Sequence, residues 1–81
     1  MEFSQLDLKV ARFFIEHPVH WHSETKVSMA LDCDDVREPI IKLAYIGFIM
    51  NDKHGDYMLY YNPLVSLTIR LCMESAGCDA Q

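Results

Sequence analysis

Residues 46–61 read IGFIMNDKHGDYMLYY, and this stretch is the strongest guide to the fold. It contains two apolar and aromatic runs that are separated by a short polar loop at 53–56. Gly55 in that loop can take the left-handed backbone conformation that a tight hairpin needs. The pattern predicts a β-hairpin with strands from Phe48 to Asp52 and from Tyr57 to Tyr61.

The segment before the hairpin has the periodicity of a helix. Its apolar stripe recurs every three or four residues and consists of Val36, Ile40, Leu43 and Ala44. Asp32 is predicted to cap the start of this helix, with Asp35 as its reciprocal partner, and Gly47 is predicted to end it. Pro39 falls in the helix interior, where it removes the hydrogen bond to the Asp35 carbonyl. We therefore expect a kink, at a cost of about 3 kcal/mol.

Two more helices are predicted upstream of this segment. The first runs from Ser4 to Glu16, where Ser4 caps the start and Asp7 is a weak capping-box partner. Pro18 stops it, because the residue before a proline is pushed out of the helical region. A brief second helix begins at Ser23 and runs to about Ala30. The piece between them, Val19 to His22, is predicted to be extended.

The chain after the hairpin predicts a final helix. Asn62 and Pro63 place a capping residue before a proline at the first helical position. The helix then runs from Leu64 to about Glu74 and is apolar on nearly all sides. Such a surface usually marks an interface, so we expect a homodimer through this helix. The expected interface residues are Leu64, Leu67, Ile69 and Leu71. The alternative is that one face closes the core of a single chain against the first helix.

Residues 29–49, MALDCDDVREPIIKLAYIGFI, are similar without a gap to the turn, recognition helix and exit of a known family. The exit is its most specific part, since Ile-Gly-Phe-Ile at 46–49 stands for the family's Leu-Gly-Leu-Ile before its hairpin. From about Leu6 to Tyr61 the chain resembles the winged helix-turn-helix domain. The resemblance implies a mainly α fold with a small β-hairpin, in which a three-helix core is followed by a wing and an extra C-terminal helix. Thr25 and Lys26 depart from the pattern, because the family usually buries Leu-Ala there.

The length of 81 residues leaves room for one core only. Half of the residues are apolar (51%) and 23% are charged, which is the composition of a folded domain. We expect a single domain over 1–74, with the wing at about 48–61 and the C-terminal helix at about 63–74. Residues 75–81 are expected to form a flexible tail.

The resemblance implies that the third helix enters the major groove of duplex DNA while the wing touches the neighbouring backbone. On that basis we expect a DNA-binding transcriptional regulator that acts as a homodimer. The expected DNA contacts are Arg37, Lys42, Tyr45 and Lys53.

The charge of the chain opposes that function. Its formal net charge is −5, and nucleic-acid binding normally needs a basic surface. Four carboxylates gather at the start of the third helix, namely Asp32, Asp34, Asp35 and Glu38. The alternative is therefore a winged-helix protein-protein interaction module that does not bind DNA.

Other chemistry has weaker signals. Three cysteines are an odd number, which favours a reducing cytoplasm over a disulfide framework. His17, His20, His22 and His54 invite a metal-binding interpretation, but their spacing is poor for zinc, and surface histidines are the simpler interpretation. Cys33 is a weak redox candidate. No catalytic spacing or phosphate loop is evident, so we expect no enzyme, no cofactor and no metal, and no apolar run reaches the length of a membrane span.

Overall fold

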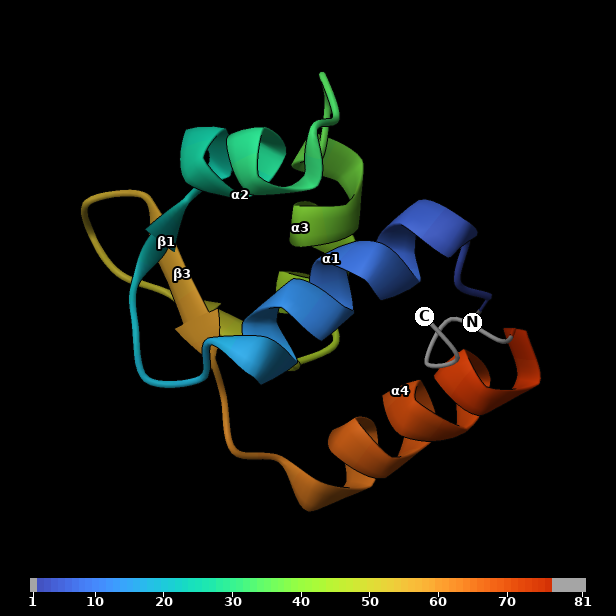
Figure 1. Ribbon diagram of the computed structural model, residues 1–81. Helices are drawn as coiled ribbons and strands as arrows, with labels where there is room; N and C mark the ends of the chain where they lie inside the picture. Colours follow the sequence, from blue (N-terminus) through green and yellow to red (C-terminus); the bar gives the residue numbers. More distant parts are fainter. Residues whose placement is uncertain (1, 77–81) are drawn as a thin grey trace.

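The computed structural model describes residues 2–76, and within them the fold is mainly helical, with four helices and one three-stranded antiparallel sheet (Figure 1). None of the helices in this range is long and apolar enough to cross a membrane. The elements follow one another as α1 (Gln5–Glu16), β1 (His22–Ser23), α2 (Glu24–Leu31), α3 (Arg37–Tyr45), β2 (Ile49–Asn51), β3 (Asp56–Leu59) and α4 (Pro63–Ala76).

The predicted start and end of α1 are confirmed. The Ser4 hydroxyl accepts a hydrogen bond from the Asp7 backbone N–H (3.1 Å), and the Asp7 carboxylate accepts one from the Ser4 N–H (2.8 Å). This reciprocal pair satisfies two of the donors that a helix start leaves open. The helix ends at Glu16, two residues before Pro18. Its inner face supplies the middle of the core, where Val10, Ala11 and Phe14 are fully buried.

The predicted cap of α3 at Asp32 is wrong. Asp32 instead ends α2, where its left-handed backbone (φ 52°, ψ 48°) turns the chain away from the helix axis. The chain then needs four more residues before α3 begins at Arg37. Val36 occupies the capping position and makes no side-chain cap, while the Asp35 carboxylate accepts a hydrogen bond from the Arg37 N–H (3.0 Å). Asp35 thus stabilises the first turn of α3 without an Asp32 partner.

The later start of α3 also overturns the predicted effect of Pro39. Pro39 is the third residue of the helix and lies in its first turn. Backbone N–H groups in a first turn have no acceptor within the helix, so a proline there removes no helical hydrogen bond. The helix continues to Tyr45, and Gly47 (φ 87°) follows its end as predicted.

The hairpin is present, with shorter strands than predicted. β2 covers Ile49–Asn51 and β3 covers Asp56–Leu59, and Gly55 has a positive φ of 85°, as expected. β3 is the central strand, since the sheet order is β1-β3-β2. It pairs with β1 through His22 opposite Tyr57, so the sheet joins the chain before α2 to the hairpin after α3 (Figure 1).

α4 begins at Pro63 and runs along α1, as the contacts between the two helices and Figure 1 show. The Asn62 carbonyl accepts from the Ser66 N–H (2.9 Å), which confirms the predicted start. The helix extends to Ala76, so the first two residues of the predicted tail are helical; residues 77–81, with Cys78, lie outside the described range. Ile69 and Met73 are buried in the core.

Candidate nucleic-acid interface

The outer face of α3 carries a mixed set of side chains. Arg37, Ile41 and Tyr45 follow one another at four-residue spacing and therefore share one face of the helix. All three are exposed, with Ile41 at 54% and Tyr45 at 85% of their maximal accessible surface. Glu38 is exposed beside them. The face thus offers one cation, one anion, one aromatic ring and one aliphatic side chain.

Lys42 has a different environment from the other residues that were expected to contact DNA. Its ammonium lies 2.6 Å from Oδ2 of Asp7 and donates a second hydrogen bond to the Glu2 carbonyl (3.1 Å). It also lies 5.9 Å from the centroid of the Phe3 ring. The Asp7 side chain is only 5% exposed, and that of Lys42 is 34% exposed. In this structure Lys42 therefore fastens α3 to the start of α1.

The position of Asp7 could have indicated this ion pair. Asp7, Val10 and Phe14 are separated by three and four residues, so the carboxylate lies on the buried stripe of α1. A carboxylate that is buried in this way needs a charged or hydrogen-bonded partner. The local pattern predicts only the capping-box role of Asp7, because the identity of its charged partner depends on the packing of α1 against α3.

The hairpin turn places Lys53 and His54 in solvent. Asp52 organises this turn, since its Oδ1 accepts from the backbone N–H of His54 (2.8 Å) and of Asp56 (2.9 Å). The hydrogen bonds from Asp56 and, to a lesser extent, from His54 hold the pKa of the Asp52 carboxyl below its usual range. The tip therefore presents one lysine next to a carboxylate that stays ionised at neutral pH.

The loop between α2 and α3 is strongly acidic, because Asp32, Asp34 and Asp35 are all exposed. Asp32 and Asp35 have local roles in ending α2 and starting α3. Cys33 lies between them with a free thiol, and its Sγ is 3.7 Å from the Asp35 carbonyl oxygen. The Ser28 hydroxyl donates to the Cys33 carbonyl and fixes the loop to α2. The carboxylates thus have structural reasons to be present, but their negative charge still faces solvent.

α4 divides the four residues that were expected at a dimer interface. Leu64, Leu67 and Leu71 are 75%, 56% and 53% exposed, and their spacing of three and four residues places them on one face. Ile69 is fully buried and belongs to the core of the single chain. One face of α4, with Ile69, closes the core of the single chain. The opposite face, with the three exposed leucines, is the one that remains available for the expected homodimer.

One of the four histidines is buried, and the other three are exposed. Among residues 2–76 no group of three or more histidine, cysteine or carboxylate side chains is placed to hold a metal ion. The interpretation as surface histidines is nevertheless wrong for His22, which is 3% exposed. Its ring lies near those of His17 and His20, at centroid distances of 5.9 and 6.3 Å. The only local feature that bears on this burial is the extended pattern expected for Val19 to His22, in which alternate side chains face opposite sides.

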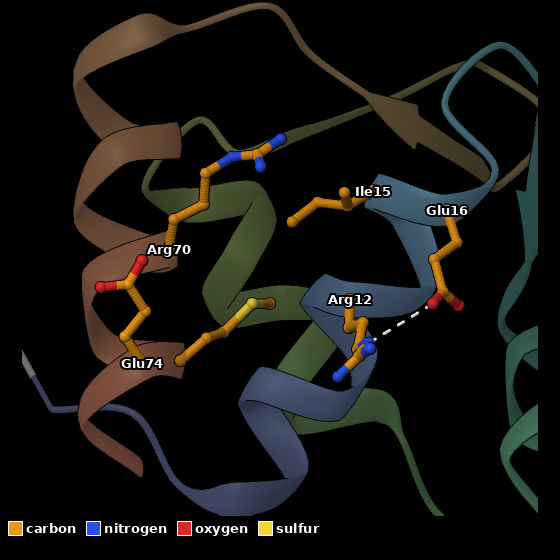
Figure 2. A pocket seen from close by; sticks show the side chains of 6 residues that line it. Arg12, Ile15, Glu16, Arg70 and Glu74 are labelled. Carbon is orange, nitrogen blue, oxygen red and sulfur yellow. Dashed lines mark hydrogen bonds and ion pairs between the residues drawn. The ribbon is translucent and has the colours of Figure 1, made fainter. Parts of the chain in front are cut away.

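A hollow of about 270 Å³ lies between α1 and α4 (Figure 2). Its lining mixes apolar side chains with charges of both signs, and consists of Arg12, Ile15, Glu16, Arg70, Met73 and Glu74. Arg12 lies 3.3 Å from Glu16 one helical turn away, as the dashed line in Figure 2 shows. This lining contains no nucleophile with an adjacent base, so it offers no arrangement for acyl or phosphoryl transfer.

Comparisons with protein-family models, with curated proteins and with solved structures give no match to this chain.

Proposed function

We propose that this chain is a winged-helix domain that binds duplex DNA as a homodimer and acts as a transcriptional regulator in the cytoplasm. The observation that carries the proposal is the arrangement of the sheet. The strand before α2 pairs with β3, and the hairpin follows α3 directly, so α2 and α3 lie in the chain between strands of one three-stranded sheet, and the hairpin that follows has an exposed turn at 53–55. In winged-helix domains this arrangement presents a recognition helix and a wing on the DNA.

Three of the expected contacts are available on these elements. Arg37 and Tyr45 are exposed on α3, and Lys53 is exposed on the tip of the hairpin, which takes the place of the wing. Lys42 is engaged by Asp7 and contributes less than the other cations. With so few cations, and with the acidic loop at 32–35 nearby, one copy binds phosphate weakly, so two copies are needed to sum their contacts.

A fluorescence-anisotropy titration with random duplex DNA at low salt tests this function. We expect binding at or below tens of micromolar protein, weakened at least about fivefold by Arg37→Ala and by Lys53→Ala. Lys9→Ala is the matched control, because it removes the same charge from an exposed site on α1. Absence of binding by the unmodified chain, or equal weakening by the control, contradicts the proposal.

The homodimer is supported by the leucine strip of α4, which consists of Leu64, Leu67 and Leu71. Tyr61 just before the helix is 85% exposed and extends the apolar surface. A strip of this kind complements a second copy of itself, as a two-fold interface requires. Light scattering should give twice the chain mass, and Leu67→Lys should reduce it to one chain. Val19→Lys also replaces an exposed aliphatic side chain by lysine, but outside α4, and should leave the dimer intact. A single-chain mass for the unmodified protein rules the dimer out.

A second candidate is an interaction module for a protein partner. It is favoured by the outer face of α3, where Ile41 and Tyr45 are exposed while the only lysine of the helix is paired internally. An apolar patch rimmed by carboxylates suits a basic partner better than a phosphate backbone. The same DNA titration separates the two functions, because the interaction module predicts no binding to duplex DNA at low salt.

A further inference from the structure

His22 connects α1 to the sheet. Its ring packs edge-on against Phe13 and Phe14, with centroid distances of 4.8 and 5.7 Å. Its backbone forms half of β1, which contains only His22 and Ser23, and stands opposite Tyr57 of β3. The His22 side chain thus packs β1, the shortest strand of the sheet, against the C-terminal part of α1.

The hydrogen bonding of this ring is incomplete. Nε2 lies 3.3 Å from the backbone carbonyl of His17, and because a carbonyl only accepts, Nε2 carries the proton. Nδ1 is buried and has no hydrogen-bond partner. The neutral ring therefore leaves one weak acceptor unsatisfied, whereas a protonated ring would bury a charged donor without an acceptor. The second arrangement is much the more costly of the two.

The charges around the ring add to this cost. His17 and His20 from the loop after α1, and Lys26 from α2, each disfavour a positive charge on His22. The nearest carboxylates in the chain and in the sheet register are Glu24 at the start of α2 and Asp56 opposite Ser23, and neither binds Nδ1. α1 contributes the two apolar rings. Burial lowers the pKa of His22 below the usual range of histidine, and the hydrogen bond to His17 only partly opposes this.

We propose that His22 is an acid-sensitive latch, in which protonation of the buried ring releases β1 from β3 and from α1 while the helices remain folded. Release breaks few backbone hydrogen bonds, since β1 pairs with β3 over two residues only. It relieves the unsatisfied Nδ1–H by exposing the ring to water. It also frees one edge of β3, so that the hairpin is no longer held to the segment before α2. This inference is independent of DNA binding.

The direction of the pH effect follows from linkage. The open form binds a proton with the ordinary pKa of histidine, about 6.5, and the closed form has a lower pKa. The latch is therefore closed above about pH 6.5. Below it the ratio of open to closed forms rises by up to about tenfold per pH unit for one proton, until the pKa of the closed form is reached.

The test is an NMR titration of the imidazole rings between about pH 8 and 4.5, combined with hydrogen-exchange protection factors for the β1–β3 amides. We expect His22 to titrate below the ordinary pKa of histidine, about 6.5. We also expect protection across His22 and Tyr57 to fall as His22 titrates, while amides of α1 and α3 stay protected. An ordinary titration of His22 with unchanged β1 protection overturns the latch, as does simultaneous loss of protection in the helices.

Two variants sharpen this test. His22→Phe keeps an aromatic ring against Phe13 and Phe14 but cannot take up a proton, so its β1 protection should not change over the same pH range. His54→Gln removes a solvent-exposed histidine and should behave as the unmodified chain. A pH-dependent loss of β1 protection in His22→Phe contradicts the proposal. Should His22→Phe fail to fold, the titration of the unmodified chain decides alone.

Discussion

Asp7 and His22 have the same exposure, 3%, and very different surroundings. The Asp7 carboxylate accepts hydrogen bonds from Lys42 and from the Ser4 N–H, so its charge is compensated where it is buried. The His22 ring makes one hydrogen bond, and its other nitrogen has no partner. A compensated buried charge holds two helices together, whereas an uncompensated buried group is stable only while it remains neutral.

The largest expected effect comes from removing the partner of Asp7. Lys42→Met leaves a buried carboxylate with only the Ser4 N–H, and we expect a loss of about 2 kcal/mol in the free energy of unfolding. Breaking a fully buried pair costs about 3–5 kcal/mol, and the value here is lower because Lys42 is one-third exposed. Urea denaturation measures it, with the exposed Lys9→Met as control. A loss equal to that of the control would show that Asp7 is not compensated by Lys42.

A smaller effect is expected from Ser4→Ala. This change removes the acceptor of the Asp7 N–H but leaves the Ser4 N–H to donate to the carboxylate, so the capping box is half lost. We expect a loss of about 1 kcal/mol, the usual cost of a helix cap. Thermal unfolding is a suitable measurement, and Ser75→Ala near the end of α4 is a control. If Ser4→Ala and Ser75→Ala have the same thermal stability, the capping box contributes nothing, and Asp7 stabilises the fold only through Lys42.

The smallest effect is expected at Asp52, which accepts two backbone hydrogen bonds but is not deeply buried. Its folded-state pKa is lowered, so its contribution is present above the unfolded pKa of about 4 and is lost as pH falls through the lower folded value. Asp52→Asn should remove this pH dependence from hairpin amide exchange. Asp34→Asn, in another exposed turn, should leave the pH dependence of hairpin exchange unchanged. The same result for both variants would show that Asp52 does not stabilise the turn.

Local signals predicted most of the secondary structure. The features that were predicted correctly depend on only a few neighbouring residues. They are the cap of α1 by Ser4 and Asp7, the start of α4 at Asn62 and Pro63, and the positive φ of Gly55. The predicted start of α3 is wrong because Asp32 suits both a helix start and a left-handed helix end. Only the length of the loop that follows, which depends on how α2 and α3 pack, selects between these two roles.

The candidate site was less predictable from the sequence. Arg37, Tyr45 and Lys53 are exposed as expected, since they lie on the outer face of α3 or in the turn of the hairpin. Lys42 is also a cation of α3, but it is bound to Asp7 and does not face solvent freely. The pattern around Lys42 does not predict this, because Asp7 is 35 residues away in the chain. The packing of the helices decides whether a cation faces solvent or a buried carboxylate, and the periodicity of the sequence does not predict this packing.

The sequence by itself determined the order and the approximate place of the helices and strands, apart from the start of α3, because capping, proline and glycine effects and apolar periodicity act within a few residues. The tertiary structure alone decided which polar groups are buried and with what partners. It pairs Lys42 with Asp7, encloses His22 between α1 and β3, and separates the buried Ile69 from the exposed leucine strip of α4. These outcomes depend on contacts between distant segments, whose energies are set only when the chain has packed.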